Sequence, residues 1–187
     1  MSINNEKGRL LTRLARAAIA RRLGEVAAGE AGPLPDWLRQ PGAVFVTLTQ
    51  HGQLRGCIGS LEAHRPLAED LEENAQAAAF RDPRFPPLSR TELPDTRIEV
   101  SILSPPEPIH FSSQEDALRQ LRPGIDGVIL EYGHHRATFL PQVWDQLPEP
   151  AQFMSHLKLK AGLPGYFWAD DLKLYRYTVE KFKEDTP

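Results

Sequence analysis

Apolar and polar residues alternate along several stretches of the chain, and a period of two predicts β-strands with one buried face. The β-branched residues around Val44 predict a strand from Ala43 to Thr49. Polar residues 50–53 then turn the chain back into a second strand, from Leu54 to Ile58. From Arg97 to Leu103 every second residue is again apolar. We therefore expect a hairpin, followed later by a strand with one polar face.

Near the N-terminus, apolar residues three or four positions apart predict an amphipathic helix. Its apolar stripe consists of Leu10, Leu11, Leu14 and Ala18. The opposite face carries Arg9, Arg13 and Arg16. The arginines and the scarcity of acidic residues before Glu25 resemble an organelle transit peptide. The apolar stripe instead fits a helix that lies on a hydrophobic core. Residues 32–35 end this region, and residues 36–38 are expected to form a short turn.

A second amphipathic helix is expected from Pro66 to Phe80, because the missing N–H of proline costs nothing at the first helical position. Its buried face is predicted to consist of Leu67, Leu71, Ala75 and Ala78. Asn74 falls within the same stripe, and a buried amide must find hydrogen-bond partners among nearby groups. Pro83 prevents the helix from continuing, so residues 80–87 are expected to form a stiff loop.

The second half of the chain carries the same kinds of element. We expect a helix with a capping box of Ser112 and Glu115 that ends at Leu121, a hairpin of strands Ile125 to Tyr132 and Arg136 to Leu140, a helix from Pro150 to Ala161, a strand from Leu172 to Val179, and a polar tail from Glu180 to Pro187. Strands in hairpins separated by single helices predict an α+β fold with a mostly antiparallel sheet flanked by helices. No repeat or linker divides the chain, so one domain is expected over residues 1–187.

Composition argues against several classes of protein. The 187 residues carry a net charge of −3, whereas a broad nucleic-acid binder needs a basic surface. One cysteine cannot form an internal disulfide, which favours a reducing cytoplasm. No window reaches the roughly 18 apolar residues of a membrane span. The six histidines lack the spacing of metal ligands, and no Gly-rich phosphate loop is present, so neither a metal nor another cofactor is expected. The alternative is a metal site assembled from residues that are separated in sequence.

Candidate chemistry centres on the only cysteine, Cys57. In a regular strand, Arg55 and Cys57 share one face, while Leu54 and Ile58 point into the core. A neighbouring guanidinium favours the thiolate over the thiol, which predicts a reactive cysteine. The alternative is a buried structural cysteine beside a surface arginine, since free cysteine is among the most buried residue types.

Two further features complete the predicted site. Gly56 and Gly59 indicate the close approach of a ligand or of another backbone. In the stiff loop, Asp82 can orient an arginine or accept a proton, and Arg84 with Arg55 can receive a carboxylate or phosphate. We expect Arg55, Cys57, Asp82 and Arg84 to border one cleft, with an arginine within salt-bridge reach of Asp82. The alternative is that Asp82 only caps a turn and pairs with Arg84.

Four blocks of this sequence resemble one family. They are LRGCIGSLEAHRPLAEDL at 54–71, DPRFPP at 82–87, IEVSILSPPEPI at 98–109 and ATFLPQVW at 137–144. From about Leu10 to Val179 the chain resembles the AMMECR-type domain, also called AmmeMemoRadiSam system protein A. The resemblance implies a single α+β domain whose biochemical activity is not established. It also implies two partners, a Memo-like protein and a radical S-adenosylmethionine protein.

Two functional hypotheses follow. In the first, the protein is a small cytoplasmic enzyme with Cys57, Arg55 and Asp82 as catalytic residues, and it works with the Memo-like and radical S-adenosylmethionine partners. In the second, it is a non-catalytic binding or accessory module that holds a peptide or small anionic ligand on the Arg55–Gly59 surface. The ligand-binding residues are then Arg55, Gly56, Gly59 and Arg84. An accessible Cys57 favours the first hypothesis, because a catalytic thiol must be reachable.

Overall fold

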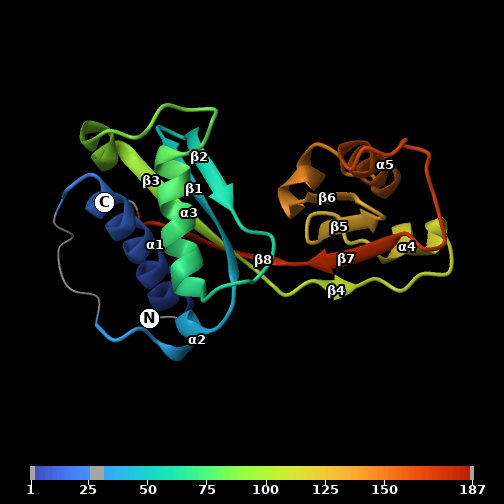
Figure 1. Cartoon of the computed structure of the whole chain (residues 1–187), viewed down its shortest axis with the longest axis horizontal. Helices are drawn as coiled ribbons and strands as arrows, with labels where there is room; N and C mark the ends of the chain where they lie inside the picture. The colour runs from blue at the N-terminus through green and yellow to red at the C-terminus, as the bar shows by residue number, and fades with distance from the viewer. Residues whose placement is uncertain (1–2, 26–31, 186–187) are drawn as a thin grey trace. The chain divides into compact units, whose positions relative to one another are not determined.

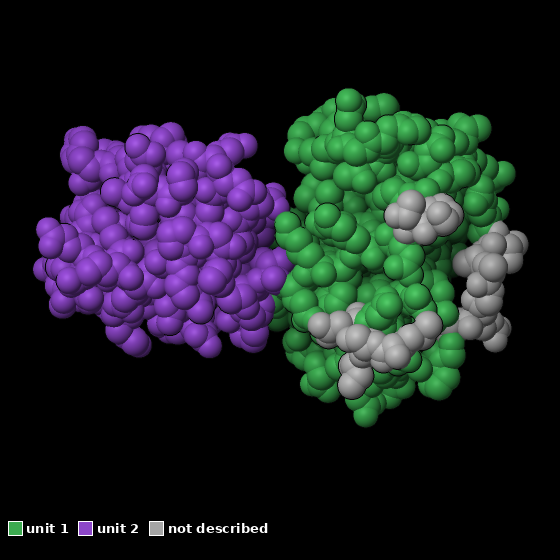
Figure 2. Space-filling view, turned by 180° about the vertical axis from the view of Figure 1, so that it is seen from behind, with its two compact units in different colours: residues 1–103, 180–187 green, residues 104–179 purple. Residues whose placement is uncertain are grey.

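The strands form two four-stranded sheets (Figure 1). Each sheet has its own hydrophobic core. The computed structural model describes residues 3–25 and 32–185. The chain divides into two compact units: unit 1 holds residues 1–103 and 180–187, and unit 2 holds residues 104–179 (Figure 2). The predicted α+β class with antiparallel strands is confirmed. That the two units together form a single domain over residues 1–187 stays a prediction.

Unit 1 contains the predicted hairpin and the two longest helices of the described chain. Its elements are α1 (Ile3–Arg22), α2 (Asp36–Arg39), β1 (Ala43–Gln50), β2 (Gln53–Gly59), α3 (Leu67–Phe80), the 3-10 helix η1 (Arg90–Asp95), β3 (Thr96–Leu103) and β8 (Val179–Lys183). The strand order is β2-β1-β3-β8, which leaves β2 at one edge. No helix in the described part of the chain is both long and apolar enough to cross a membrane.

One face of this sheet packs against α1 and α3. The core that they form includes Val44, Val46 and Leu48 from β1, Leu11, Ala15 and Ile19 from α1, and Leu71 and Ala75 from α3. The intervening residues of β1, such as Thr47 and Thr49, remain partly exposed. The period of two therefore predicted the buried face of β1 correctly, and the first helix lies on the core as expected.

The prediction that Leu54 lies in the core is wrong, because β2 contains a β-bulge. Leu48 of β1 lies opposite Gly56, but the next residue of β1, Thr49, lies opposite Leu54, so Arg55 is extra. The bulge reverses the alternation, and Leu54 is 43% exposed. Beyond the bulge the prediction is confirmed, since Ile58 packs against the core. Simple alternation across Arg55 therefore no longer places Arg55 and Cys57 on one face.

Unit 2 is built around a sheet with the order β4-β7-β5-β6. Its elements are β4 (Glu107–Pro108), α4 (Gln114–Gln120), β5 (Gly127–Tyr132), β6 (His135–Phe139), the 3-10 helix η2 (Pro141–Asp145), α5 (Pro150–Lys160) and β7 (Lys173–Tyr177). In its core the rings of Trp144 and Phe153 stack with centroids 3.8 Å apart. The predicted capping residues of α4 are one position early: Ser113 is the N-cap and accepts from the N–H of Asp116. Adjacent serines and adjacent acids make both registers possible in sequence.

The predicted last strand and polar tail are also corrected. The segment forms two strands, because β7 ends at Tyr177 and β8 begins at Val179 and joins the sheet of unit 1. β8 then runs through part of the supposed tail, where Phe182 is buried. One apolar residue among charges is a weak signal for an edge strand, and only packing against the core of unit 1 reveals it.

Candidate functional site

The backbone of Cys57 is held by the loop that follows α3. Because β2 is an edge strand, the outward-facing backbone groups of Cys57 have no neighbouring strand to bind. Asp82 Oδ2 accepts a hydrogen bond from the Cys57 N–H at 2.9 Å, and Arg84 Nη2 donates one to the Cys57 carbonyl at 3.4 Å. The loop therefore binds both outward-facing backbone groups of Cys57, as a neighbouring strand would.

Asp82 and Arg84 form the ion pair that was predicted for this loop. Arg84 Nη2 lies 2.8 Å from Asp82 Oδ2, and Arg84 Nε lies 3.0 Å from Asp82 Oδ1. These bonds, with those from the backbone N–H groups of Cys57 and Arg84, outweigh burial and hold the pKa of Asp82 well below its usual range. The pKa of Arg84 is raised, chiefly by the same side-chain bond. Asp82 is thus an ionised carboxylate at neutral pH, and it suits the positioning of Cys57 better than proton transfer.

The two glycines of the motif allow close packing on either side of Cys57. A Cβ atom at Gly56 would lie 2.1 Å from the carbonyl oxygen of Ala78 on α3, so only glycine permits this approach of helix and strand. A Cβ atom at Gly59 would lie 2.2 Å from the ring of Phe45, which is its partner on β1. The close approach predicted for both residues is therefore made by the protein itself. A role for either glycine in ligand binding stays a prediction.

Arg55 pairs with Glu92 of η1 and not with Asp82. Arg55 Nε lies 3.0 Å from Glu92 Oε1, and Arg55 Nη2 donates to the carbonyl of Pro86 at 2.8 Å. The bond from Arg55, together with bonds from Ser89, lowers the pKa of Glu92 from 4.5 to about 2. Arg55 itself is only 7% exposed. Its Nη1 is buried and has no hydrogen-bond partner among the residues that the structure describes.

The ring of Phe85 lies close to both arginines of the predicted site. The guanidinium carbons of Arg55 and Arg84 lie 5.7 Å and 5.5 Å from the centroid of its ring. Asp82 and Arg84 bind the backbone of Cys57 directly, and Phe85 lies beside Arg55 as well as Arg84. The structure therefore brings the Asp82–Arg84 loop against the middle of β2, where it reaches both Arg55 and the backbone of Cys57, although the Arg55 ion pair with Glu92 was not predicted. That the four predicted side chains border a ligand-binding cleft stays a prediction.

Comparisons with known proteins identify the family. A model of the AMMECR1 family matches residues 12–182, which is most of the chain. The chain belongs to the AMMECR1 family. A protein of Methanothermobacter thermautotrophicus is 42% identical over 98% of this chain and 97% of its own length. Protein MJ0810 of Methanocaldococcus jannaschii is 40% identical over 97% and 92%.

A solved structure supports the same assignment. The crystal structure of the uncharacterized protein PH0010 from Pyrococcus horikoshii superposes with a TM-score of 0.82. It is 37% identical in sequence, and the match covers 98% of this chain and 94% of that chain. The similarity establishes the AMMECR1 family and its fold, and it carries no reaction, ligand or partner with it.

The thiol of this AMMECR1-family chain points to a partner that sequence reasoning missed. Cys57 lies opposite Thr47 of β1, and Cys57 Sγ and Thr47 Oγ1 are 3.3 Å apart. Cys57 is partly exposed, as a reactive thiol must be. Hairpin register could have indicated Thr47, but counting back from the turn fails at the bulge. Among the described residues, no group of three or more His, Cys, Asp and Glu side chains is arranged to hold a metal ion.

A buried polar network supports the sheet beside the motif. Asp70 of α3 is fully buried and accepts hydrogen bonds from the N–H of Val44, from Ser60 Oγ and from Arg65 Nε. Asn74 Nδ2 donates to the carbonyl of Val44 at 3.2 Å and to Ser60 Oγ at 3.0 Å. The expectation that Asn74 satisfies nearby backbone is therefore confirmed. Asp70 was missed, because its partners come from β1 and from the loop before α3, and no local pattern connects them.

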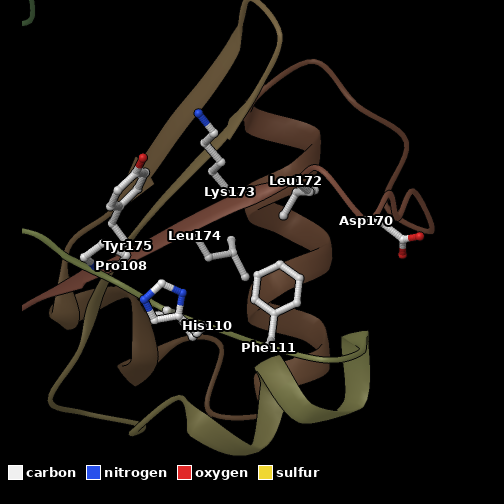
Figure 3. A pocket seen from close by; sticks show the side chains of 9 residues that line it. Pro108, His110, Phe111, Asp170, Leu172, Lys173, Leu174 and Tyr175 are labelled. Carbon is white, nitrogen blue, oxygen red and sulfur yellow. The ribbon is translucent and has the colours of Figure 1, made fainter.

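A hollow in unit 2 contains none of the predicted site residues. It has a volume of about 380 Å³ and lies along β7, between this strand and the segment that follows β4 (Figure 3). Tyr175 and Lys173 reach it from β7, and His110 and Phe111 reach it from the other segment. His110 and Lys173 are exposed, and neither makes an ion pair among the described residues. This hollow gives no chemical reason to move the candidate site away from Cys57.

Proposed function

We propose that this AMMECR1-family protein is a small thiol enzyme in which Cys57 is the nucleophile. The observation that carries the proposal is a partly exposed cysteine whose backbone N–H and carbonyl are both bound by the Asp82–Arg84 loop. A thiolate attacks best when it is reachable and held in one orientation. Because the Thr47 hydroxyl is the one hydrogen-bond partner of Sγ among the described residues, the thiol proton passes to solvent in this scheme.

The other residues of the site have positioning roles in this proposal. Asp82 and Arg84 hold the backbone of Cys57, and the Arg84 side chain is 54% exposed, so it can also meet an anionic substrate group. Arg55 supports the bulge through Glu92 and Pro86. The substrate would come from a radical S-adenosylmethionine protein, with a Memo-like protein as a further partner, in the reducing cytoplasm. These partners and this location rest on the resemblance to AmmeMemoRadiSam system protein A.

Alkylation tests the proposal directly. The folded protein should react with iodoacetamide at pH 7 faster than a free thiol with a pKa of about 8.5 does, and mass spectrometry should place the label on Cys57. Arg84→Gln should slow this reaction, since it removes the cation that lies beside Cys57. Metabolite pools from cells that lack the protein would then be screened for turnover, which Cys57→Ser should abolish. No labelling of the folded protein, with normal labelling in urea, would identify a structural cysteine and end the enzyme hypothesis.

A second candidate function is non-catalytic binding of a peptide or small anionic ligand on the Arg55–Gly59 surface. The observation in its favour is the buried Nη1 of Arg55, which has no partner among the described residues. An unpaired buried donor is costly, and a carboxylate or phosphate oxygen would satisfy it. Binding that persists in Cys57→Ser and disappears in Arg55→Lys, without any turnover, would favour this module over the enzyme.

A further inference from the structure

The open face of the unit 1 sheet carries a polar hollow of about 560 Å³. This is the face opposite to the one that α1 and α3 cover. Its lining includes Thr47 and Thr49 from β1, Arg97 and Glu99 from β3, Lys183 from β8 and His51 from the hairpin turn. All the lining residues belong to unit 1. No motif in the sequence predicted this surface.

Strand register connects the hollow to the thiol. Thr47 lies opposite Cys57 on one side and opposite Glu99 on the other, and Thr49 lies opposite Arg97. Directly opposed residues of an antiparallel sheet project from the same face, so these side chains share the open face. With strands about 4.8 Å apart and about 3.4 Å per residue, the Cα atoms of Cys57 and Arg97 are about 12 Å apart. Cys57 lies outside the lining, but its Sγ contacts the Thr47 hydroxyl.

Among the residues that line the hollow, Arg97 is the cation that forms no ion pair within the described chain. It forms no ion pair or hydrogen bond through its side chain within the described chain, although it is partly buried. The neighbouring charges are mostly neutralised, because Lys183 pairs with Glu99 at 3.6 Å and Glu184 pairs with Arg16 at 2.6 Å. Asp95 also lines the hollow, but it is exposed and makes no ion pair with Arg97.

We propose that this hollow is an anion site in which Arg97 receives the carboxylate or phosphate group of the Cys57 substrate. The inference rests on the proposed function and specifies its substrate class. The planar guanidinium offers forked donors to an oxyanion, and the Thr49 hydroxyl opposite is a further donor. The span from Arg97 to Cys57 then suits a small acid whose reacting carbon lies several bonds from its charged group.

Two alkylating reagents of different charge test this site. Iodoacetate carries a carboxylate and iodoacetamide is neutral. The rate at Cys57 with iodoacetate, divided by the rate with iodoacetamide, therefore reports attraction of an anion. The ratio should exceed that of a free thiol in the same buffer by about two- to fivefold, as expected for one partly exposed charge interaction. Arg97→Gln should remove this excess, and the iodoacetamide rate of the same variant is the reference that corrects for any change in the thiol itself. Asp95→Asn should raise the ratio, and inorganic phosphate should slow iodoacetate selectively.

Variants of two other arginines distinguish attraction of the anion by Arg97 from attraction by the overall charge of the protein. Arg13→Gln removes an exposed arginine of α1 away from the hollow, and it should leave the ratio unchanged. Arg84→Gln tests the cation beside the Cys57 carbonyl. A ratio that does not respond to Arg97→Gln, or that falls equally in Arg13→Gln, would overturn the proposal.

A second readout keeps this site distinct from the proposed enzyme activity. If neither reagent labels the folded protein, the thiol-enzyme proposal fails, and phosphate binding is then measured in Cys57→Ser by NMR. Phosphate should shift the Arg97 Nε–H signal and the backbone signals of Thr47 and Thr49. A titration in which these signals do not move would show that the hollow is not an anion site.

Discussion

At the scale of single residues, the environment of each side chain decides which of the predicted roles it can hold. Asp82 is buried and accepts bonds from both Cys57 and Arg84, so its charge is used to hold the structure together. Arg55 balances Glu92 instead of facing a ligand with its whole guanidinium. Cys57 is a partly exposed residue, and it is the nucleophilic side chain of the group. The proposed chemistry is therefore concentrated on one thiol.

Gly56 gives the clearest prediction for one residue. Gly56→Ala places a methyl group against the backbone oxygen of Ala78, so β2 and α3 must separate, and unfolding free energy should fall by about 3 kcal/mol. Urea denaturation followed by circular dichroism measures this loss. Gly32→Ala is the matched control, because nothing lies within 4 Å of its added Cβ, and it should change stability little. Similar losses in both variants would contradict the packing role of Gly56.

At the scale of elements, the bulge in β2 and the capped 3-10 helix η1 depend on each other. The extra residue, Arg55, binds Glu92, and Glu92 also completes the capping box of η1 with Ser89. The irregular strand and the short helix thus share one carboxylate. This arrangement explains why a charged residue is tolerated in a nearly buried position of the strand.

The bulge predicts unequal effects for two apolar residues of β2. Ile58→Ala should lower the unfolding free energy by about 2 kcal/mol, because Ile58 packs against the core of unit 1. Leu54→Ala should cost less than about 1 kcal/mol, because Leu54 is 43% exposed. Chemical denaturation of both variants provides the measurement. Equal costs would mean that the strand runs without a bulge and that both residues lie in the core.

The shared carboxylate predicts a specific pH dependence of stability. The folded-state pKa of Glu92, about 2, lies below its ordinary value of 4.5, so folding favours the ionised form. The stabilisation should be complete above about pH 4.5 and should be lost as the pH falls toward 2. Glu92→Gln should therefore be less stable than wild type at pH 7, and the two urea midpoints should converge on acidification. Parallel curves between pH 7 and pH 2 would contradict this linkage.

At the scale of the whole molecule, the residues that match the AMMECR1 family form two hydrophobic cores. Unit 2 is a continuous segment inserted between β3 and β8 of unit 1. Its two ends are tied together, since Ser104 N–H donates to the Thr178 carbonyl and Thr178 N–H donates to Ser104 Oγ, both at 2.8 Å. The AMMECR1 match nevertheless covers both units, from residue 12 to residue 182.

We expect the segment 104–179 to fold when it is produced alone. It contains its own buried cluster, and its paired ends require no connection through unit 1. A dispersed NMR spectrum and one cooperative urea transition are the expected results. The same segment with Phe153→Ala should lose about 3–5 kcal/mol and serves as the unfolded control. A disordered wild-type segment would instead support one cooperative domain over residues 1–187.

The elements of the fold could be predicted from local patterns in the sequence. The hairpin of β1 and β2, the buried face of α3 and the stiff loop after it follow from periodicity and from proline, which act within a few residues. The ion pair of Asp82 and Arg84 is also local, since two positions separate them. The family resemblance rested on the same continuous blocks. The sequence by itself therefore determined the α+β class, most helices and strands, and the segment that holds the candidate site.

Tertiary structure decided the features that join distant parts of the chain. Arg55 meets Glu92 and Cys57 meets Thr47 only after the hairpin, the bulge and η1 have taken their places. β8 could not be distinguished from a polar tail, because Phe182 gains its burial from a core formed by residues far away in sequence. The hollow around Arg97 likewise depends on strand register. Local patterns carry no information about register once one extra residue enters a strand, so the geometry of the site emerged only with the fold.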